Sequence, residues 1–184
     1  MKKVILGIIF TMLLTACGST SVNDNPSNGN NNSSDEKEPM YEGVSGFIIS
    51  LSSDEMLVIG IKDNEEATYY SFNDKTIVED GHGDWLSYKD LRIGQFVDTY
   101  YRGGIAESYP MQGGAAKVII HSDATYPPAT GIANAISTLD VEDDYPYIYA
   151  FNKDGDFWTI EISFLNQSQS NIQFKINEDG EIIE

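Results

Sequence analysis

Short runs of aromatic and β-branched residues, each closed by turn-forming residues, constrain the fold of this chain most strongly. Residues 44–51 and 56–61 are two apolar runs separated by Ser-Ser-Asp-Glu, and a third run at 68–72 follows a second polar turn. Runs of this length between polar turns are typical of antiparallel β-strands. We therefore expect residues 44–72 to form a three-stranded meander.

The next stretch predicts a loop, a short helical turn and two more strands. Residues 73–84 contain two glycines and several Asn and Asp, with one short apolar piece, Ile77-Val78. Trp85, Tyr88 and Leu91 recur at three-residue spacing, which favours a helical turn ending near Gly94. Alternation over 95–101 and the apolar run 115–120 predict the fourth and fifth strands.

Five short strands with a small helix between the third and fourth match the layout of an OB-fold-like five-stranded barrel. A different small barrel and an open antiparallel sheet are the alternatives. A Pro-rich connector at 123–130 then predicts a boundary before a second module at 131–184. The length of chain that is left for folded structure allows either one compact unit or two small ones.

The second module reads as one helix followed by a small sheet. Ile132, Ala135, Ile136 and Leu139 lie at helical spacing, and strand-type runs follow at 147–151, 157–164 and 172–176. This predicts a small helix plus a three-stranded antiparallel sheet, an order similar to that of cystatin-like or PepSY-like modules. The chain is thus expected to be mostly β, and α+β overall.

The first 17 residues predict export and a lipid anchor. Lys2 and Lys3 precede an apolar run that is too short to span a membrane. The tetrad that ends this run, Leu14-Thr15-Ala16-Cys17, resembles the lipobox of bacterial lipoproteins, and the resemblance implies a diacylglyceryl group on Cys17. Two acyl chains hold a protein on a membrane stably. The alternative is a plain secreted protein with a free thiol.

Behind the signal peptide at 1–16, residues 17–40 are rich in Asn, Ser, Asp and Gly, so we expect a disordered tether. The folded OB-like domain is expected at 41–122. Cys17 is the only cysteine, so an intramolecular disulfide is excluded. The expected location is the cell membrane, lipid-anchored, on its extracytoplasmic face.

The charge of the chain argues against polyanionic partners. It holds 11 Lys and Arg against 29 Asp and Glu, a formal net charge of -18. Nucleic-acid binding depends on basic residues that neutralise phosphates, so no nucleic-acid partner is expected. Acidity of this kind mainly supports solubility, with a basic partner or weakly bound cations as the alternative.

Four segments resemble a known family. They are Gly46-Phe47-Ile48-Ile49, Met56-Leu57-Val58, the segment at 91–97 and, most specifically, Glu107-Ser108-Tyr109-Pro110-Met111-Gln112. Over residues 44–121 the chain is similar to the domain of unknown function 3221, found in lipoproteins and secreted proteins of Bacillus-type bacteria. The family often has Ala where this chain has Met111 and Gly113-Gly114. The resemblance implies an OB-like domain at the cell surface with no established activity.

The segment around Tyr109 has two interpretations. Pro110 cannot donate to a strand ladder, and Gly113-Gly114 widen the backbone choices, so the segment can be a rigid corner between strands four and five. Alternatively, Tyr109 and Gln112 form a recognition surface beside the barrel mouth. Trp85 adds a further aromatic candidate, because OB-folds also bind oligosaccharides.

Catalytic patterns are missing from the sequence. His82 and His121 are the only histidines, and pairing of His82 with Asp80 or Asp84 is a remote acid-base candidate. The calcium-loop resemblance at 152–156 fails, because Phe157 and Ser163 occupy the glycine and acidic positions of an EF-hand. We expect no enzyme, cofactor or metal.

The expected function is therefore a non-enzymatic module that binds a protein or an envelope component. One alternative is a cell-envelope glycan-binding module. Another is an inhibitor of a secreted hydrolase, for which an acidic surface would suit a basic target.

Overall fold

The structure is a computed structural model that describes residues 38–61, 66–139, 144–166 and 170–183. These residues all belong to one compact unit, Lys37–Glu184. The predictions for the signal peptide and the lipobox residues Leu14, Thr15, Ala16 and Cys17 lie outside the described residues, as does nearly all of the predicted tether. The proposed domain boundaries stay predictions.

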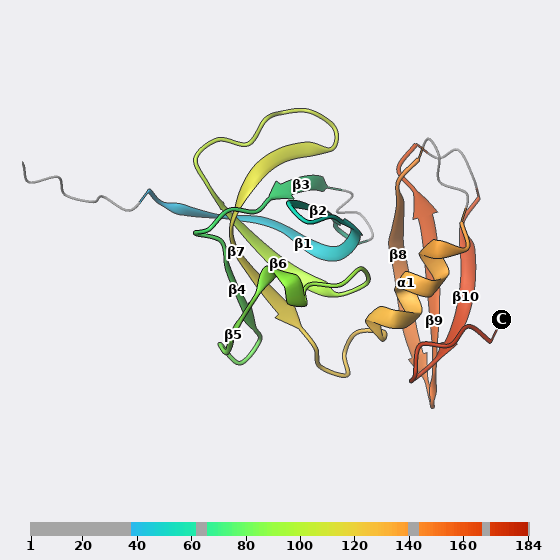
Figure 1. Ribbon diagram of the computed structural model, residues 1–184. Coiled ribbons are helices and arrows are strands. Elements are labelled where there is room, and N and C mark those ends of the chain that lie inside the picture. Colours follow the sequence, from blue (N-terminus) through green and yellow to red (C-terminus); the bar gives the residue numbers. More distant parts are fainter. Residues whose placement is uncertain (1–37, 62–65, 140–143, 167–169, 184) are drawn as a thin grey trace, which may run out of the picture. The chain divides into compact units, whose positions relative to one another are not determined.

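The described part of the chain is mostly β, as predicted, with strands in two sheets and one small α-helix (Figure 1). The first sheet contains seven strands: β1 (Met40–Leu51), β2 (Glu55–Ile59), β3 (Ala67–Ser71), β4 (Ile77–Asp80), β5 (Trp85–Leu86), β6 (Phe96–Arg102) and β7 (Met111–His121). The second part contains α1 (Ala129–Ser137), β8 (Pro146–Asp154), β9 (Phe157–Phe164) and β10 (Ile172–Asn177).

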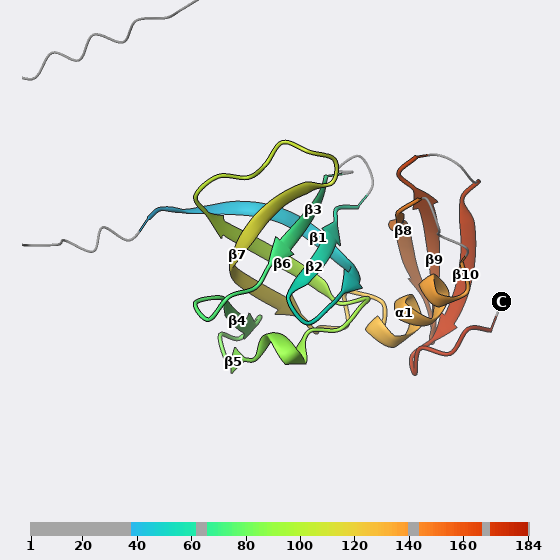
Figure 2. The ribbon, with the colours of Figure 1, turned by 45° about the horizontal axis from the view of Figure 1, so that its top comes forward.

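Five strands of the first sheet are paired in a closed order. The sheet runs β3-β2-β1-β6-β7-β4-β5, and β3 pairs in addition with β7. The β3–β7 pairing is parallel and joins Thr68 to Met111, whereas β1, β2, β3, β6 and β7 are otherwise joined by antiparallel pairs. We call this closed set β1, β2, β3, β6 and β7 the strand ring; Figure 2 shows it from a second side.

The meander predicted at 44–72 is present as β1, β2 and β3. β1 begins earlier than expected, at Met40, and its pairing with β6 is interrupted between Glu42 and Ser45. At Gly46 the strand passes so close to β2 that an added Cβ would overlap the backbone of Ile59. A glycine is therefore required at this position for the two strands to approach.

The segment between β3 and β6 differs from the prediction. The expected loop at 73–84 contains β4, whose Ile77–Asp80 pair in parallel with residues 117–120 of β7. Trp85 lies in β5 and not in a helical turn, which is limited to a 3₁₀ helix at Tyr88–Asp90. Four residues of β4 were too few to give a periodic pattern, and their parallel pairing with β7 depends on residues about 40 positions away.

The helix and the three-stranded sheet of the second part are confirmed. α1 buries Ile132 and Ala135, and the sheet has the order β10-β9-β8 with antiparallel pairs. β8 and β9 turn at Gly155, which has a φ of 60°. The segment 152–156 is thus a tight hairpin end.

Two groups of buried side chains make up the core. The first fills the strand ring with inward-facing residues such as Ile48, Val58 and Val97. The second combines residues of β1, β2 and β6 with α1 and the β8–β10 sheet, and its members include Phe47, Phe96, Ile132, Trp158 and Ile160. Apolar contacts therefore continue from the first sheet into the second.

Candidate binding site

A cavity of about 560 Å³ opens at one end of the strand ring. Its walls carry the rings of Tyr41, Tyr70 and Tyr101, and we call it the tyrosine pocket. Tyr41 of β1 is the register partner of Tyr101 of β6, and their ring centroids lie 5.6 Å apart with an angle of 30° between planes. Strand pairing therefore fixes two aromatic side chains next to each other at the entrance.

The inner end of the pocket is formed by β3. Thr68 and Tyr70 are two residues apart on this strand and so face the same side, the interior of the ring. Both residues are fully buried. The phenol oxygen of Tyr70 accepts a 2.9 Å hydrogen bond from the amide of Val44, which fixes this ring in place.

The hydroxyl of Thr68 is the unusual group here. Its oxygen is buried, and among the described residues no hydrogen-bond partner reaches it. Thr99, the other threonine buried inside the ring, donates a 2.7 Å hydrogen bond to the carbonyl of Val44. Buried polar atoms are nearly always paired, so an unpaired hydroxyl on a residue that lines the pocket is an exception.

Three exposed carboxylates surround the pocket: Glu42 on β1, Glu66 just before β3, and Glu107 in the loop between β6 and β7. Among the described residues that line the pocket, none is Lys, Arg or His. Ile105 and Met111 add apolar wall. The pocket is thus aromatic and apolar along its sides and negative around its edge.

Tyr109 stands beside this pocket. The loop at 103–110 is anchored at its base by two backbone hydrogen bonds between Ala106 and Gln112, and Ser108 Oγ donates to the carbonyl of Pro110. The Tyr109–Pro110 peptide bond is cis, and Tyr109 is 61% exposed. A second cavity of about 500 Å³ contacts Tyr109 and shares Glu66, Glu107 and Met111 with the tyrosine pocket.

Of the three predicted surface residues, only Tyr109 contacts one of these two cavities. Gln112 lies in β7 opposite Tyr69, three positions from Tyr109, although its side chain faces away from the side on which Met111 lines the pocket. Trp85 pairs with Glu79, which pairs with Ile119 of β7. Ile119 is seven positions beyond Gln112, or roughly 23 Å along the strand. Trp85, 78% exposed, therefore belongs to a different surface.

Sequence reasoning missed the residues that form the pocket itself. Tyr41 stood at the edge of the predicted tether, and Tyr101 was treated as an ordinary strand residue. The alternation of Thr68 and Tyr70 was a usable signal, since a threonine on the same face as a core tyrosine places a hydroxyl inside the fold.

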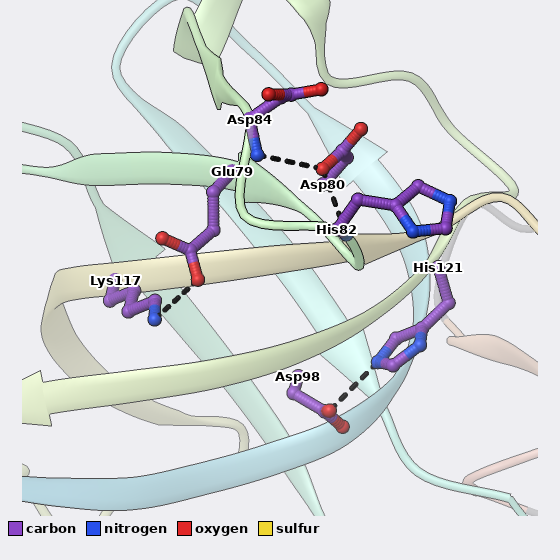
Figure 3. Close-up of polar contacts among 7 residues, drawn as sticks. All are labelled: Glu79, Asp80, His82, Asp84, Asp98, Lys117 and His121. Carbon is purple, nitrogen blue, oxygen red and sulfur yellow. Dashed lines mark hydrogen bonds and ion pairs between the residues drawn. The ribbon is translucent and has the colours of Figure 1, made fainter.

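Asp80 contacts both His82 and Asp84 through their backbone amides. Asp80 Oδ1 accepts hydrogen bonds of 2.9 Å from the backbone amides of both His82 and Asp84, and Figure 3 shows that both end on backbone nitrogens. The amide of Asp84, more than any other group, lowers the pKa of the Asp80 carboxyl. Asp80 thus acts as the organising acceptor of a turn.

The second histidine belongs to a hydrogen-bonded chain with an aspartate at its centre. His121 Nε2 lies 2.8 Å from Asp98 Oδ2, and Ser45 Oγ donates to Asp98 Oδ1 at 2.6 Å (Figure 3 shows the His121–Asp98 pair). Nucleophilic catalysis requires the serine to bond to the histidine. Here the serine bonds to the aspartate, so the chain joins β1, β6 and β7 without activating the hydroxyl.

Within residues 38–61, 66–139, 144–166 and 170–183, no three His, Cys, Asp or Glu side chains gather closely enough to hold a metal ion. In the same part of the chain, no helix has the length and apolarity needed to cross a membrane.

One family model matches part of the chain. Residues 45–120 match the family model described as "Protein of unknown function (DUF3221)", which confirms the predicted resemblance for this part of the chain. None of the curated proteins compared with the chain matches it. None of the solved structures does so either. The matched segment runs from β1 to β7 and contains Thr68, Tyr70, Tyr101, Tyr109 and Gln112.

Proposed function

We propose that this chain is a lipid-anchored lipoprotein of the Bacillus type, held on the extracytoplasmic face of the cell membrane as a non-enzymatic binding module. The anchor rests on Leu14-Thr15-Ala16-Cys17, which follows a basic start and a short apolar run. The Asn- and Ser-rich residues behind Cys17 would place the folded part away from the lipid headgroups.

We further propose that the strand ring is an OB-like barrel. Taken in chain order, its strands β1, β2, β3, β6 and β7 are the first to the fifth, and they pair in the order 1-2-3-5-4-1 with a parallel contact between the third and fifth. OB-folds bind ligands with strands two and three and with the loops after strands one and four. In this chain those elements include Thr68, Tyr70, Glu107 and Tyr109.

The observation that carries the binding role is the tyrosine pocket at the open end of the ring. Its volume of about 560 Å³ falls within the usual range of ligand sites, and mouths of small barrels are common places for them. The anchored loop at 103–110 and the buried pairing of Tyr70 with Val44 hold its walls in a defined shape. The pocket is therefore proposed as the binding site.

The proposal is tested in intact cells with a photoactivatable phenylalanine analogue in place of Tyr109. We expect a discrete crosslinked product there, and none from a matched variant with the same analogue at Trp85, which is more exposed but lies elsewhere. Equal crosslinking from both positions would speak against a specific site. Separately, Cys17→Ser should release the protein from the membrane fraction, and full retention would refute the anchor.

An envelope glycan is the second candidate ligand. The fixed pair of Tyr41 and Tyr101 and the exposed Tyr109 offer ring faces on which a sugar can pack. Purified cell wall should then sediment the soluble domain, and Tyr101→Ala should abolish sedimentation while Trp85→Ala leaves it unchanged. If no wall preparation sediments the domain, the glycan-binding hypothesis is wrong.

A further inference from the structure

We infer that the tyrosine pocket receives the side chain of a lysine from a basic polypeptide partner. This inference rests on the proposed function, because it takes the pocket to be the binding site. It goes further by assigning the chemical class of the ligand. Three independent features support it: the charge around the entrance, the aromatic and apolar walls, and the unpaired hydroxyl of Thr68.

The charge around the entrance selects a cation. Glu42, Glu66 and Glu107 come from three separate elements and converge on one opening, and the described lining contains no basic side chain to neutralise them. All three carboxylates are exposed and stay in contact with water. They therefore attract a cation, and none of them has to be buried to do so. Such a rim raises the rate of encounter with a positively charged partner and repels an anionic one.

The walls suit the long aliphatic stem of lysine. Tyr41 and Tyr101 present neighbouring rings at the entrance, and Ile105 and Met111 extend the apolar surface. Lysine packs its methylene groups along surfaces of this kind, and its ammonium group is attracted to the faces of tyrosine rings. A carboxylate or phosphate ligand is negatively charged, so the same ring faces would repel it.

Thr68 gives the ammonium group a bonding partner within the pocket. Thr68 lines the pocket and is 0% exposed, and its hydroxyl oxygen is buried and unpaired among the described residues. A hydroxyl oxygen accepts a hydrogen bond from an ammonium N–H, and the compact ammonium needs fewer converging acceptors than the five-donor fork of arginine. One unpaired hydroxyl therefore favours lysine over arginine.

The test uses the soluble chain lacking residues 1–17 and a capped peptide, Gly-Ser-Lys-Ser-Gly, observed by NMR titration. Matched peptides carry Nε-acetyl-lysine or arginine in the central position. We expect saturable shifts at the amides of Thr68, Tyr70 and Tyr101 with the lysine peptide, weakened by added salt. Acetylation should abolish them. Equal binding of the acetylated or the arginine peptide would overturn the lysine assignment.

Two variants locate the binding determinants. The triple substitution Glu42→Gln, Glu66→Gln, Glu107→Gln should weaken peptide binding about tenfold or more, since each exposed charge contributes modestly. The control triple Asp74→Asn, Asp84→Asn, Asp156→Asn changes the net charge equally at exposed positions outside the pocket and should leave affinity within about twofold. Equal losses in both triples would show a nonspecific charge effect and overturn the inference.

Thr68→Val separates a ligand-binding role from a structural one. It removes an unpaired hydroxyl at nearly constant shape, so stability should be unchanged or higher, while peptide affinity falls. Thr99→Val, which breaks a bond to Val44, should lower stability instead. Retained affinity in Thr68→Val would overturn the role of this hydroxyl. If the lysine peptide does not bind but crosslinking at Tyr109 persists, only the ligand class is wrong. If neither binding nor crosslinking is observed, the proposed site is wrong as well.

Discussion

The amide of Val44 donates a hydrogen bond to the phenol oxygen of Tyr70, and the two residues belong to strands that are not neighbours in the sheet. The bond crosses the interior of the strand ring from β1 to β3. Val44 lies where the pairing of β1 with β6 is interrupted, so its amide and carbonyl depend on side chains, Tyr70 for the first and Thr99 for the second. The inner wall of the tyrosine pocket thus also holds β1 and β3 together.

Tyr70→Phe should lower the free energy of unfolding by about 1–3 kcal/mol, because it leaves the buried amide of Val44 without an acceptor. The measurement is denaturant unfolding at neutral pH. Tyr88→Phe is the matched control, since Tyr88 is 38% exposed and should change stability by no more than about 0.5 kcal/mol. Equal stability of Tyr70→Phe and the wild type would mean that the Val44 bond does not matter.

Gly46→Ala should destabilise the protein strongly, by about 3 kcal/mol or more, since the new methyl group would overlap the backbone of β2 at Ile59. Backbone atoms within a sheet cannot move aside as a flexible side chain can. Gly114→Ala in β7 is the control, because no atom lies within 4 Å of its added Cβ. Thermal unfolding of the two variants compares them directly, and similar midpoints would contradict the argument.

Local patterns were sufficient to predict the parts of the fold that rest on adjacent strands. The meander β1–β3, the helix around Ile132 and Ala135, and the sheet β8–β10 all have periodic apolar residues and recognisable turns. β4 and the parallel contact of Thr68 with Met111 join segments about 40 residues apart. Such pairings leave no periodic signal in the sequence, which is why the seven-stranded sheet could not be predicted.

The free energy of unfolding should fall at alkaline pH, because Tyr69 holds its proton more tightly in the folded state. Burial, followed by a hydrogen bond with Tyr145, raises the pKa of Tyr69 from 10.0 to about 12. The unfolded chain loses this proton at lower pH than the folded one, so the stabilisation is fully present below pH 10.0 and is lost as pH rises toward about 12. Unfolding free energies measured across this window should fall less steeply in Tyr69→Phe.

Tyr126→Phe should reduce the same alkaline slope, because burial also raises the pKa of Tyr126, with the charges of Asp123 and Asp98 adding to the effect. The double variant with Tyr69→Phe should then be flatter than either single variant. A slope that is the same in all three variants and the wild type would show that other groups govern the alkaline transition.

The candidate site was only partly accessible to sequence reasoning. Tyr109 was singled out because Pro110 and the paired glycines interrupt a strand pattern, and the structure places it beside the pocket. Tyr41, Thr68 and Tyr101 belong to three strands that meet only after the ring has closed, and each alone looks like a typical strand residue. Trp85 was chosen for residue type alone, and it lies on another surface.

The shared apolar core predicts that the two sheets lose stability together. Ile160 of β9 is fully buried in the cluster that also contains Phe47 and Phe96 of the first sheet. Ile160→Ala should lower the free energy of unfolding by about 2–5 kcal/mol through lost burial and a residual cavity. Amide hydrogen exchange should then accelerate in β1 and β6 as well as in β8–β10, since opening one sheet uncovers the apolar face of the other.

Gln173→Ala provides the matched control within the same sheet, because Gln173 is exposed on β10 and should leave exchange unchanged in every strand. Faster exchange confined to β8–β10 in Ile160→Ala would show two independently opening modules, as the Pro-rich connector at 123–130 predicts. Acceleration in both sheets would instead mean that Phe47 and Phe96 transmit the loss across the core, so that the part carrying the tyrosine pocket depends on the second sheet for its stability.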